Sequence, residues 1–267
     1  MSRIKGCFER LKSDGRKALI PYITAGDPDQ AATLPMMHRL VESGADIIEL
    51  GIPFSDPMAD GPVIQRAAER ALEKGTSLHN VLEMVKRFRE TDKETPVVLM
   101  GYLNPVEVMG YATFARAAAE AGVDGVLTVD LPPEEGTEMH DVLLANNIDP
   151  IFLLAPTSTV ERIRKICNAS SGYVYYVSLK GITGAGHLDL DSVASKLGEI
   201  RKQTDLPVGV GFGIKDAETA SRMGKLADAV IVGSAIVTRI EENAEQPEAA
   251  IESVGNFVAE LRRGLDA

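Results

Sequence analysis

The chain alternates short apolar runs with longer segments whose apolar residues recur at helical spacing. The short runs are rich in β-branched residues and carry few polar positions. This pattern is typical of strands that are buried on both faces of a parallel sheet. We expect eight such strands, at Ala18–Thr24, Asp46–Leu50, Pro96–Met100, Asp124–Val129, Pro150–Leu154, Gly172–Val177, Pro207–Gly211 and Asp228–Val232.

The segments between these runs have the period of amphipathic helices. They include Asp29–Ser43, Val63–Glu73, Thr113–Ala121, Glu134–Asn146, Val160–Ala169, Leu190–Gln203 and Asp216–Gly224. Eight strands, each followed by a helical segment, match a (β/α)8 TIM barrel, whose typical length is about 250 residues. An extra amphipathic helix at Ser2–Lys12 would cover the floor of that barrel.

A short pattern recurs where three of the strands begin: a small residue, an Asp, then the buried run. It is found at Gly44–Ile48, Gly122–Val126 and Leu226–Val230. The spacing is irregular, which excludes a solenoid. Because no Pro/Ser-rich linker divides the chain, we expect one domain over residues 1–267. A doubly wound open sheet is the alternative fold, but it would have fewer strands and a Gly-rich first turn, which Thr24–Pro28 is not.

The amino-acid composition of the chain argues against several classes of function. The chain has 28 Lys and Arg against 39 Asp and Glu, a net charge of −11, and no basic stripe, which argues against nucleic acids and anionic membranes. Two Cys are too few for a disulfide framework, and the four His lack metal-ligand spacing, so we expect no metal. Without a signal-like start or a long apolar run, we expect a cytoplasmic location.

Two acidic residues are candidates for catalysis. Glu49 interrupts an apolar run, and if Ile48 and Leu50 face the helices, its side chain points into the barrel at the carboxyl end of the second strand. Burial there should raise its pKa, whereas Asp60 lies in a polar loop. Two acids in unlike environments make an acid–base pair. Alternatively, Glu49 caps a loop or pairs with a buried Arg, and Asp60 caps the helix after Pro62.

Glycine-rich segments follow the sixth, seventh and eighth strands, at Gly181–Gly186, Gly209–Gly213 and Val232–Ala235. Glycine lets phosphate oxygens approach the backbone closely, and helix N-termini attract anions. Barrels often bind phosphate at the last two of these loops. Three such segments on consecutive loops favour a phosphate site, to which Ser234 would add a hydroxyl donor.

Several large side chains lie at or near strand ends. Alternation along the sixth strand puts Tyr173 and Tyr175 on one face, where core packing is the alternative to a functional role. Apolar residues at four other strand ends suit a flat pocket for an aromatic ring, although such residues are more often plain core. These residues are Tyr22, Met100, Leu127 and Phe212.

The run Leu50–Gln65, LGIPFSDPMADGPVIQ, closely resembles the signature of the tryptophan synthase α subunit family. Matching motifs extend over nearly the whole chain, at Thr24–Pro28, Tyr102–Pro105, Asp130–Pro132, Gly181–Gly184, Gly211–Ile214 and Gly233–Val237. The resemblance implies a TIM-barrel lyase of L-tryptophan biosynthesis. Its reaction is the retro-aldol cleavage of indole-3-glycerol phosphate to indole and glyceraldehyde 3-phosphate.

The resemblance also implies roles for individual residues. Glu49 matches the general acid/base, Asp60 the acid beside the indole nitrogen, and Tyr175 an active-site tyrosine. Further matches are the phosphate-binding residues Gly184, Gly213, Gly233 and Ser234, the loop residue Thr183, and the indole-pocket residues Tyr22, Ile64, Met100, Leu127 and Phe212. Tyr22 stands where we would expect Phe, so the site must accommodate an additional hydroxyl.

A partner is implied as well: a β subunit that carries pyridoxal phosphate and receives indole in an α2β2 tetramer, with no cofactor in this chain. The matching contact residues are Asp56, Asn104, Pro105, Asp130 and Pro132, for which ordinary loop chemistry is the alternative.

Other functions stay open. A stand-alone lyase acting on the same substrate is one. Another is a different phosphate-binding barrel isomerase, which should carry a Lys or an Asp pair at the ends of the first and fifth strands; Tyr22–Thr24 and Phe152–Leu154 lack them. A silent scaffold that only activates a partner would not retain both Glu49 and Asp60.

Overall fold

The computed structural model describes residues 2–178, 190–211 and 213–267. Its strands are β1 (Ala18–Thr24), β2 (Ile48–Gly51), β3 (Val97–Gly101), β4 (Gly125–Thr128), β5 (Asp149–Ile151), β6 (Leu153–Leu154), β7 (Val174–Val177), β8 (Val208–Gly211) and β9 (Ala229–Val232). All the pairs are parallel, and the strands lie in the order β5-β4-β3-β2-β1-β9-β8-β7-β6.

The barrel closes at its fifth repeat. β5 pairs with β4 and β6 pairs with β7, while Phe152 between them accepts a hydrogen bond from the Tyr175 amide at 3.2 Å. The two ends of the strand order therefore meet, which confirms the predicted TIM barrel. The strand expected at Pro150–Leu154 is split in two, so the described residues form nine strands.

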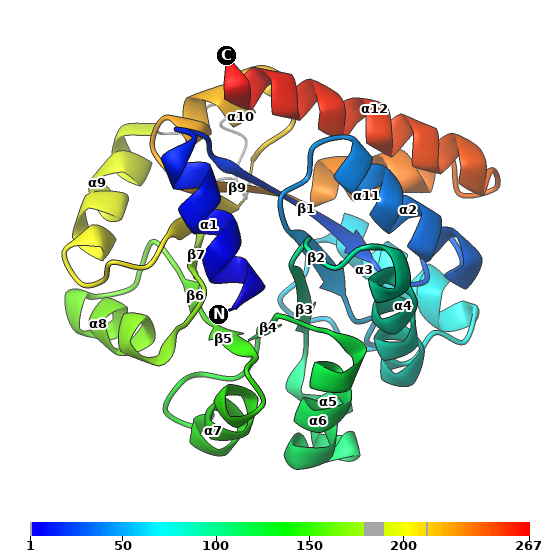
Figure 1. The fold of residues 1–267 in the computed structure, drawn as a ribbon, viewed down its shortest axis with the longest axis horizontal. Helices are drawn as coiled ribbons and strands as arrows, with labels where there is room; N and C mark the ends of the chain where they lie inside the picture. The colour runs from blue at the N-terminus through cyan, green and yellow to red at the C-terminus, as the bar shows by residue number, and fades with distance from the viewer. Residues whose placement is uncertain (1, 179–189, 212) are drawn as a thin grey trace.

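Helices surround the barrel in Figure 1. They are α1 (Arg3–Ser13), α2 (Gln30–Glu42), α3 (Pro62–Glu73), α4 (Leu78–Thr91), α5 (Leu103–Met109), α6 (Tyr111–Ala121), α7 (Thr137–Ala145), α8 (Val160–Ala169), α9 (Leu190–Arg201), α10 (Ala217–Gly224), α11 (Ser234–Glu242) and α12 (Pro247–Asp266). The expected helices are present, and α4, α5 and α12 are additional. In the described ranges, no helix has the length and apolar character needed to cross a membrane. The single domain expected over residues 1–267 stays a prediction.

Helix α1 covers one end of the barrel, as expected (Figure 1). Ser2 caps its first turn by accepting a hydrogen bond from the Lys5 amide. One face, formed by Ile4, Cys7, Phe8 and Leu11, packs into the barrel interior. The Phe8 ring lies 5.9 Å from the ring of Tyr173, a residue at the entrance to β7. The helix therefore seals the floor and keeps water from the interior above it.

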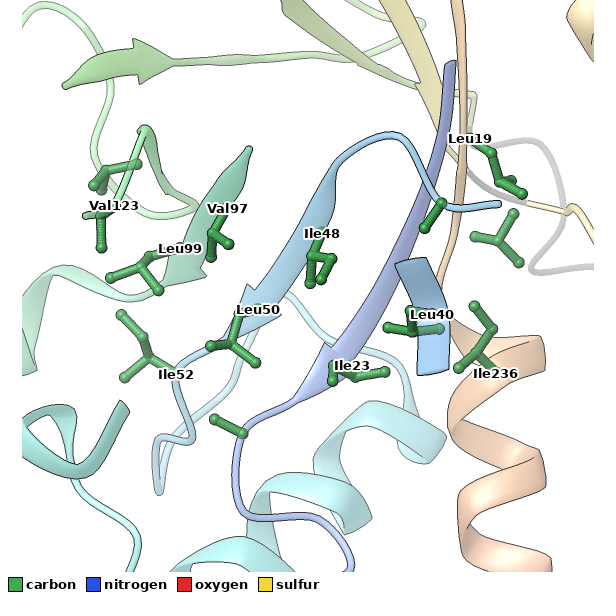
Figure 2. Packing of buried hydrophobic residues seen from close by; sticks show 14 of the residues in the cluster. Leu19, Ile23, Leu40, Ile48, Leu50, Ile52, Val97, Leu99, Val123 and Ile236 are labelled. Carbon is green, nitrogen blue, oxygen red and sulfur yellow. The ribbon is translucent and has the colours of Figure 1, made fainter. Parts of the chain in front are cut away.

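Side-chain alternation separates an outer core from an inner one. Ile48 and Leu50 of β2 pack outward with Leu40 of α2 and Ile236 of α11, as Figure 2 shows. The inner cluster contains side chains from the floor helix and from most of the strands, including Val98, Leu127 and Ile231. Because neighbours on a strand face opposite sides, Glu49 is directed into the barrel interior.

The recurring Asp residues join neighbouring strands at the floor. Asp46 Oδ2 accepts a hydrogen bond from the Leu19 amide at 2.8 Å, across the β1–β2 joint. Asp124 does the same for the Val97 amide at 2.8 Å, and Asp228 for the Val208 amide at 3.0 Å. Each carboxylate thus ties the beginning of its own strand to the strand before it.

The Asp124 carboxylate is also held by two cations, the buried Arg89 and the more exposed Arg3. Arg89 is 7% exposed and donates from Nη2 to Asp124 Oδ2 at 2.7 Å, while Arg3 donates to Oδ1 at 2.8 Å. The Arg89 guanidinium also donates to the carbonyls of Gly122 and Thr95. A side chain at position 122 would collide with Arg89, since its Cβ would lie 2.8 Å from Cγ. The Arg89–Asp124 pair is therefore a buried, fully hydrogen-bonded link.

Removing one partner of such a pair leaves an uncompensated buried charge. We expect Arg89→Ala to lower the free energy of unfolding by about 3–5 kcal/mol. Arg222→Ala, which removes an exposed residue 3.9 Å from Glu218, is the matched control and should change it by less than about 0.5 kcal/mol. Urea denaturation of both variants measures the difference, and equal midpoints would contradict the role given to Arg89.

Candidate active site

Glu49 is buried in the barrel. It is 1% exposed, and its Oε1 atom has no hydrogen bond within the described residues. Burial raises the pKa of this carboxyl to about 8. Neither sequence-based alternative is seen in the described part of the chain: Glu49 caps no loop amide there and pairs with no Arg. An unpaired carboxyl that holds its proton near neutral pH is suited to act as a general acid.

Asp60 lies in the loop between β2 and α3, where it is half-buried. Tyr102 donates a hydrogen bond from its hydroxyl to Asp60 Oδ2 at 3.0 Å. Burial raises the pKa of Asp60, and this hydrogen bond acts in the opposite direction. The helix-cap alternative for Asp60 is wrong, because the N-cap of α3 is Gly61 and no side chain caps that helix. The Asp60 carboxylate is therefore not used to cap the helix that follows it.

Burial and the charges of both acids affect the pKa of Tyr22. Its pKa is raised by burial and by the charges of Asp60 and Glu49. The hydroxyl that we expected to need room lies 3.2 Å from Thr24 Oγ1 and above Gly51. A Cβ at position 51 would lie only 2.2 Å from the hydroxyl oxygen, so glycine makes the space for this tyrosine.

Tyr175 occupies a comparable position on β7. Its hydroxyl lies over Gly211, where a Cβ would approach to 2.3 Å. The pKa of Tyr175 is raised well above its ordinary value by burial, and also by the charges of Glu49 and Asp60. The side chain packs against the inner cluster, so it contributes to the core.

The predicted indole-pocket residues lie in two adjoining layers. Tyr22, Ile64 and Met100 belong to one apolar cluster with Val63, Ala67 and Val237. Leu127 is fully buried in the inner cluster, and Met100 contacts both clusters. Phe212 lies outside the described residues. Four of the five predicted residues therefore form a continuous apolar surface.

The predicted anion site begins at α11. Gly233 is its N-cap, no side chain caps it, and Ser234 is its exposed first residue. The first amides of a helix have no intrahelical acceptor and attract anions. A Cβ at Gly233 would lie 3.7 Å from the Tyr22 ring, so this helix start adjoins the apolar cluster. Gly213 is exposed with a φ of 76°. Gly184 and Thr183 lie outside the described residues.

The predicted partner surface lies on the neighbouring loops. Asp56 and Asn104 are exposed and Pro105 is half-buried on α5. Asp130 accepts a hydrogen bond from the Leu103 amide at 2.8 Å, which caps the start of α5. This bond is the loop chemistry that we held as the alternative for Asp130. The half-buried Pro132 follows two residues later.

These features define an acid–base enzyme on a TIM barrel. A family model described as tryptophan synthase alpha chain matches residues 8–266. The chain therefore belongs to the tryptophan synthase alpha chain family, a family of lyases that catalyse an aldol cleavage.

Individual relatives agree with this assignment. The tryptophan synthase alpha chain of Thioalkalivibrio sulfidiphilus is 64% identical over 266 residues, covering 100% of both chains. That of Dechloromonas aromatica is 62% identical over 100% of this chain and 98% of its own. The crystal structure of tryptophan synthase subunit alpha from Legionella pneumophila has a TM-score of 0.93 at 47% identity, and covers 100% of this chain and 99% of its own.

Sequence reasoning missed the role of Tyr102 beside Asp60. The motif Tyr102–Pro105 was noticed only for its resemblance and its contact residues. A tyrosine directly after the third strand, next to the loop that carries the second acid, was the available signal. The contact between Tyr102 and Asp60 depends on how closely the loops after β2 and β3 approach each other. The pattern within a single segment of sequence does not predict this distance.

The buried carboxyl should make stability depend on pH. Glu49 keeps its proton in the folded chain up to about pH 8 and loses it near 4.5 when unfolded. The folded state therefore binds more protons, and stability falls as pH rises through this window. We expect Glu49→Gln to be more stable than the wild type by about 3 kcal/mol at pH 7 and by little at pH 4.

Chemical denaturation at pH 4, 5, 6 and 7 measures this gap. Glu161→Gln, at a side chain that is 70% exposed, is the control and should leave the pH dependence unchanged. A constant difference between Glu49→Gln and wild type over this range would show that Glu49 is not buried as a protonated acid.

Proposed function

We propose that this chain cleaves indole-3-glycerol phosphate to indole and glyceraldehyde 3-phosphate. The surroundings of Tyr22 carry the proposal: it is the register partner of Glu49 across β1 and β2, its ring adjoins Gly233 at the start of α11, and burial and the charge of Asp60 raise its pKa. Two acids, an apolar surface and a helix N-terminus are thereby grouped at one site. Such a group matches a substrate with a ring at one end and a phosphate at the other.

The residues supply each proton transfer. Glu49, protonated at rest, donates to indole C3 and converts the ring to an indolenine cation that can leave. Ionised Asp60 beside N1 stabilises this cation. Glu49, now ionised, then accepts the proton of the hydroxyl on the glycerol carbon attached to C3. The O–H electrons form the C=O bond of the aldehyde, while the electrons of the breaking bond to C3 return to the ring and neutralise the cation. Indole leaves as a neutral molecule, and Glu49 regains its proton.

The other site residues bind the substrate in this proposal. Tyr22, Ile64, Met100 and Leu127, with Phe212, hold the indole ring. The amides of Gly184, Gly213, Gly233 and Ser234 hold the phosphate, and Thr183 orients Asp60. Tyr175, whose pKa is raised by burial and by the charges of both acids, contacts the reacting glycerol portion. We assign no cofactor to this chain and place pyridoxal phosphate in the partner.

Replacing either acid should stop chemistry while substrate still binds. We expect Glu49→Gln and Asp60→Asn each to lower kcat by more than ~100-fold, with KM changed much less. Release of indole from indole-3-glycerol phosphate, followed by absorbance, measures both. Glu161→Gln should keep wild-type turnover, and near-normal turnover of Glu49→Gln would refute the assignment.

We further propose that the partner is the β subunit, in an α2β2 tetramer. Two of the large apolar side chains that are most exposed in the described ranges, Met58 at 86% and Val108 at 83%, lie on the Asp56 loop and on α5. Exposed apolar residues next to polar ones are a mark of protein interfaces. A solved tryptophan synthase from M. tuberculosis, in an aminoacrylate-bound form, contains a chain with a TM-score of 0.88 at 37% identity; the match covers 99% of this chain and 100% of that one. The cytoplasmic location stays a prediction.

Binding of the partner should raise the lyase activity. We expect weak indole release from this chain alone and strong stimulation, saturating near one β subunit per chain, when β subunit is titrated in. Met58→Asp and Val108→Asp should weaken the binding, whereas Leu144→Asp, at a residue 44% exposed on α7, should not. Unchanged turnover on titration would instead favour an independent lyase.

A further inference from the structure

Tyr102 lies between the second acid and a helix of the predicted partner surface. It follows β3 directly, is the N-cap residue of α5, and is 4% exposed. Its ring lies 5.3 Å from the ring of Phe54 in the loop after β2. Its hydroxyl accepts a hydrogen bond from the Ala59 amide and donates one to Asp60 Oδ2, both at 3.0 Å. One side chain therefore holds both the backbone and the carboxylate of this loop.

Other contacts hold only the backbone at Asp60. Its amide donates to the Pro57 carbonyl at 3.0 Å, and its carbonyl accepts from Gln65 Nε2 at 2.8 Å. Within the described residues, Tyr102 is the one donor to the Asp60 carboxylate. Without that hydroxyl, the side chain is free to turn about its own bonds even when the loop keeps its path.

Tyr102 is also the N-cap residue at the start of α5. The Leu103 amide is bonded to Asp130, and Asn104 and Pro105 follow at once. The two α5 residues that the sequence predicted as partner contacts, Asn104 and Pro105, are thus within three positions of Tyr102. A small displacement of the start of α5 would move the phenol along with it, because the ring is buried and cannot swing independently.

We propose that Tyr102 is a positioning residue that orients Asp60 for reaction and transmits partner binding at α5 to that carboxylate. The proposal rests on the function proposed above. Its physical basis is the Tyr102 hydroxyl, which already accepts a hydrogen bond from the Ala59 amide and donates one to Asp60. The donated bond has a single direction, so the position of the phenol sets the position of the Asp60 oxygen.

Tyr102→Phe tests the proposal, because it removes only the hydroxyl. In the reconstituted complex we expect kcat to fall about 10-fold or more while KM changes less than about 3-fold. The stimulation by β subunit should shrink by a similar factor, although β subunit still binds with wild-type affinity. The acid side of the kcat–pH profile should move to higher pH, since the hydroxyl favours the ionised form of Asp60.

Tyr111→Phe is the matched control. Tyr111 donates its hydroxyl to Glu107 of α5, so this variant also loosens a tyrosine from α5 and leaves the bond to Asp60 intact. We expect wild-type kcat, pH profile and stimulation from it. If Tyr111→Phe and Tyr102→Phe behave alike, or if Tyr102→Phe behaves as wild type, the proposal is wrong.

A measurement that needs no turnover tests the positioning role of Tyr102 independently of the proposed lyase reaction. The titration of the Asp60 carboxyl, followed by 13C NMR, should move to higher pH in Tyr102→Phe and stay unchanged in Tyr111→Phe. The two other site tyrosines whose pKa values respond to the charge of Asp60, Tyr22 and Tyr175, are the same in both variants. An unmoved titration overturns the positioning role, whereas absence of indole release by the wild-type complex overturns only the proposed reaction.

Discussion

The site depends on one unfavourable burial: the carboxyl of Glu49 lies inside an apolar barrel with no hydrogen bond to Oε1 in the described structure. Water would lower the pKa of this group, so the chain must exclude water from below and from the sides. Helix α1 seals the floor, and the ring of the fully buried Tyr173 packs 5.9 Å from Phe8 of that helix. The raised pKa of Glu49 is therefore a property of the whole closed barrel.

Asp60 shows the opposite arrangement at the same end of the barrel. It belongs to a loop, is partly exposed, and has a hydroxyl donor that favours its charged form. Glu49 is fixed by a strand, whereas Asp60 depends on side chains from other elements for its direction. The two acids thus differ in environment: within the described residues no hydrogen bond reaches Glu49 Oε1, whereas a hydroxyl donates to the Asp60 carboxylate. Loops can respond to a partner, and strands of a closed barrel respond far less.

Periodicity accounts for most of the features that were predictable from the sequence. The outward placement of Ile48 and Leu50 required Glu49 to face inward, and the order of strands and helices required a barrel. The split at Phe152 was not predictable, because it depends on which neighbour each half of a short strand pairs with. The contact of Tyr102 with Asp60 was missed for a related reason: it joins loops from two repeats, and periodicity describes only one segment at a time. The helix-cap alternative for Asp60 failed because Gly61 took that position instead.

The three Asp carboxylates at the floor of the barrel connect neighbouring strands in pairs. Asp46, Asp124 and Asp228 close the joints β1–β2, β3–β4 and β8–β9, each within a consecutive pair of repeats. The exposed turn around Gly75, between α3 and α4, falls between two such pairs. The molecule is in this sense modular in units of two repeats. New chain ends opened at that turn would leave all three joints whole and lie apart from the buried acid.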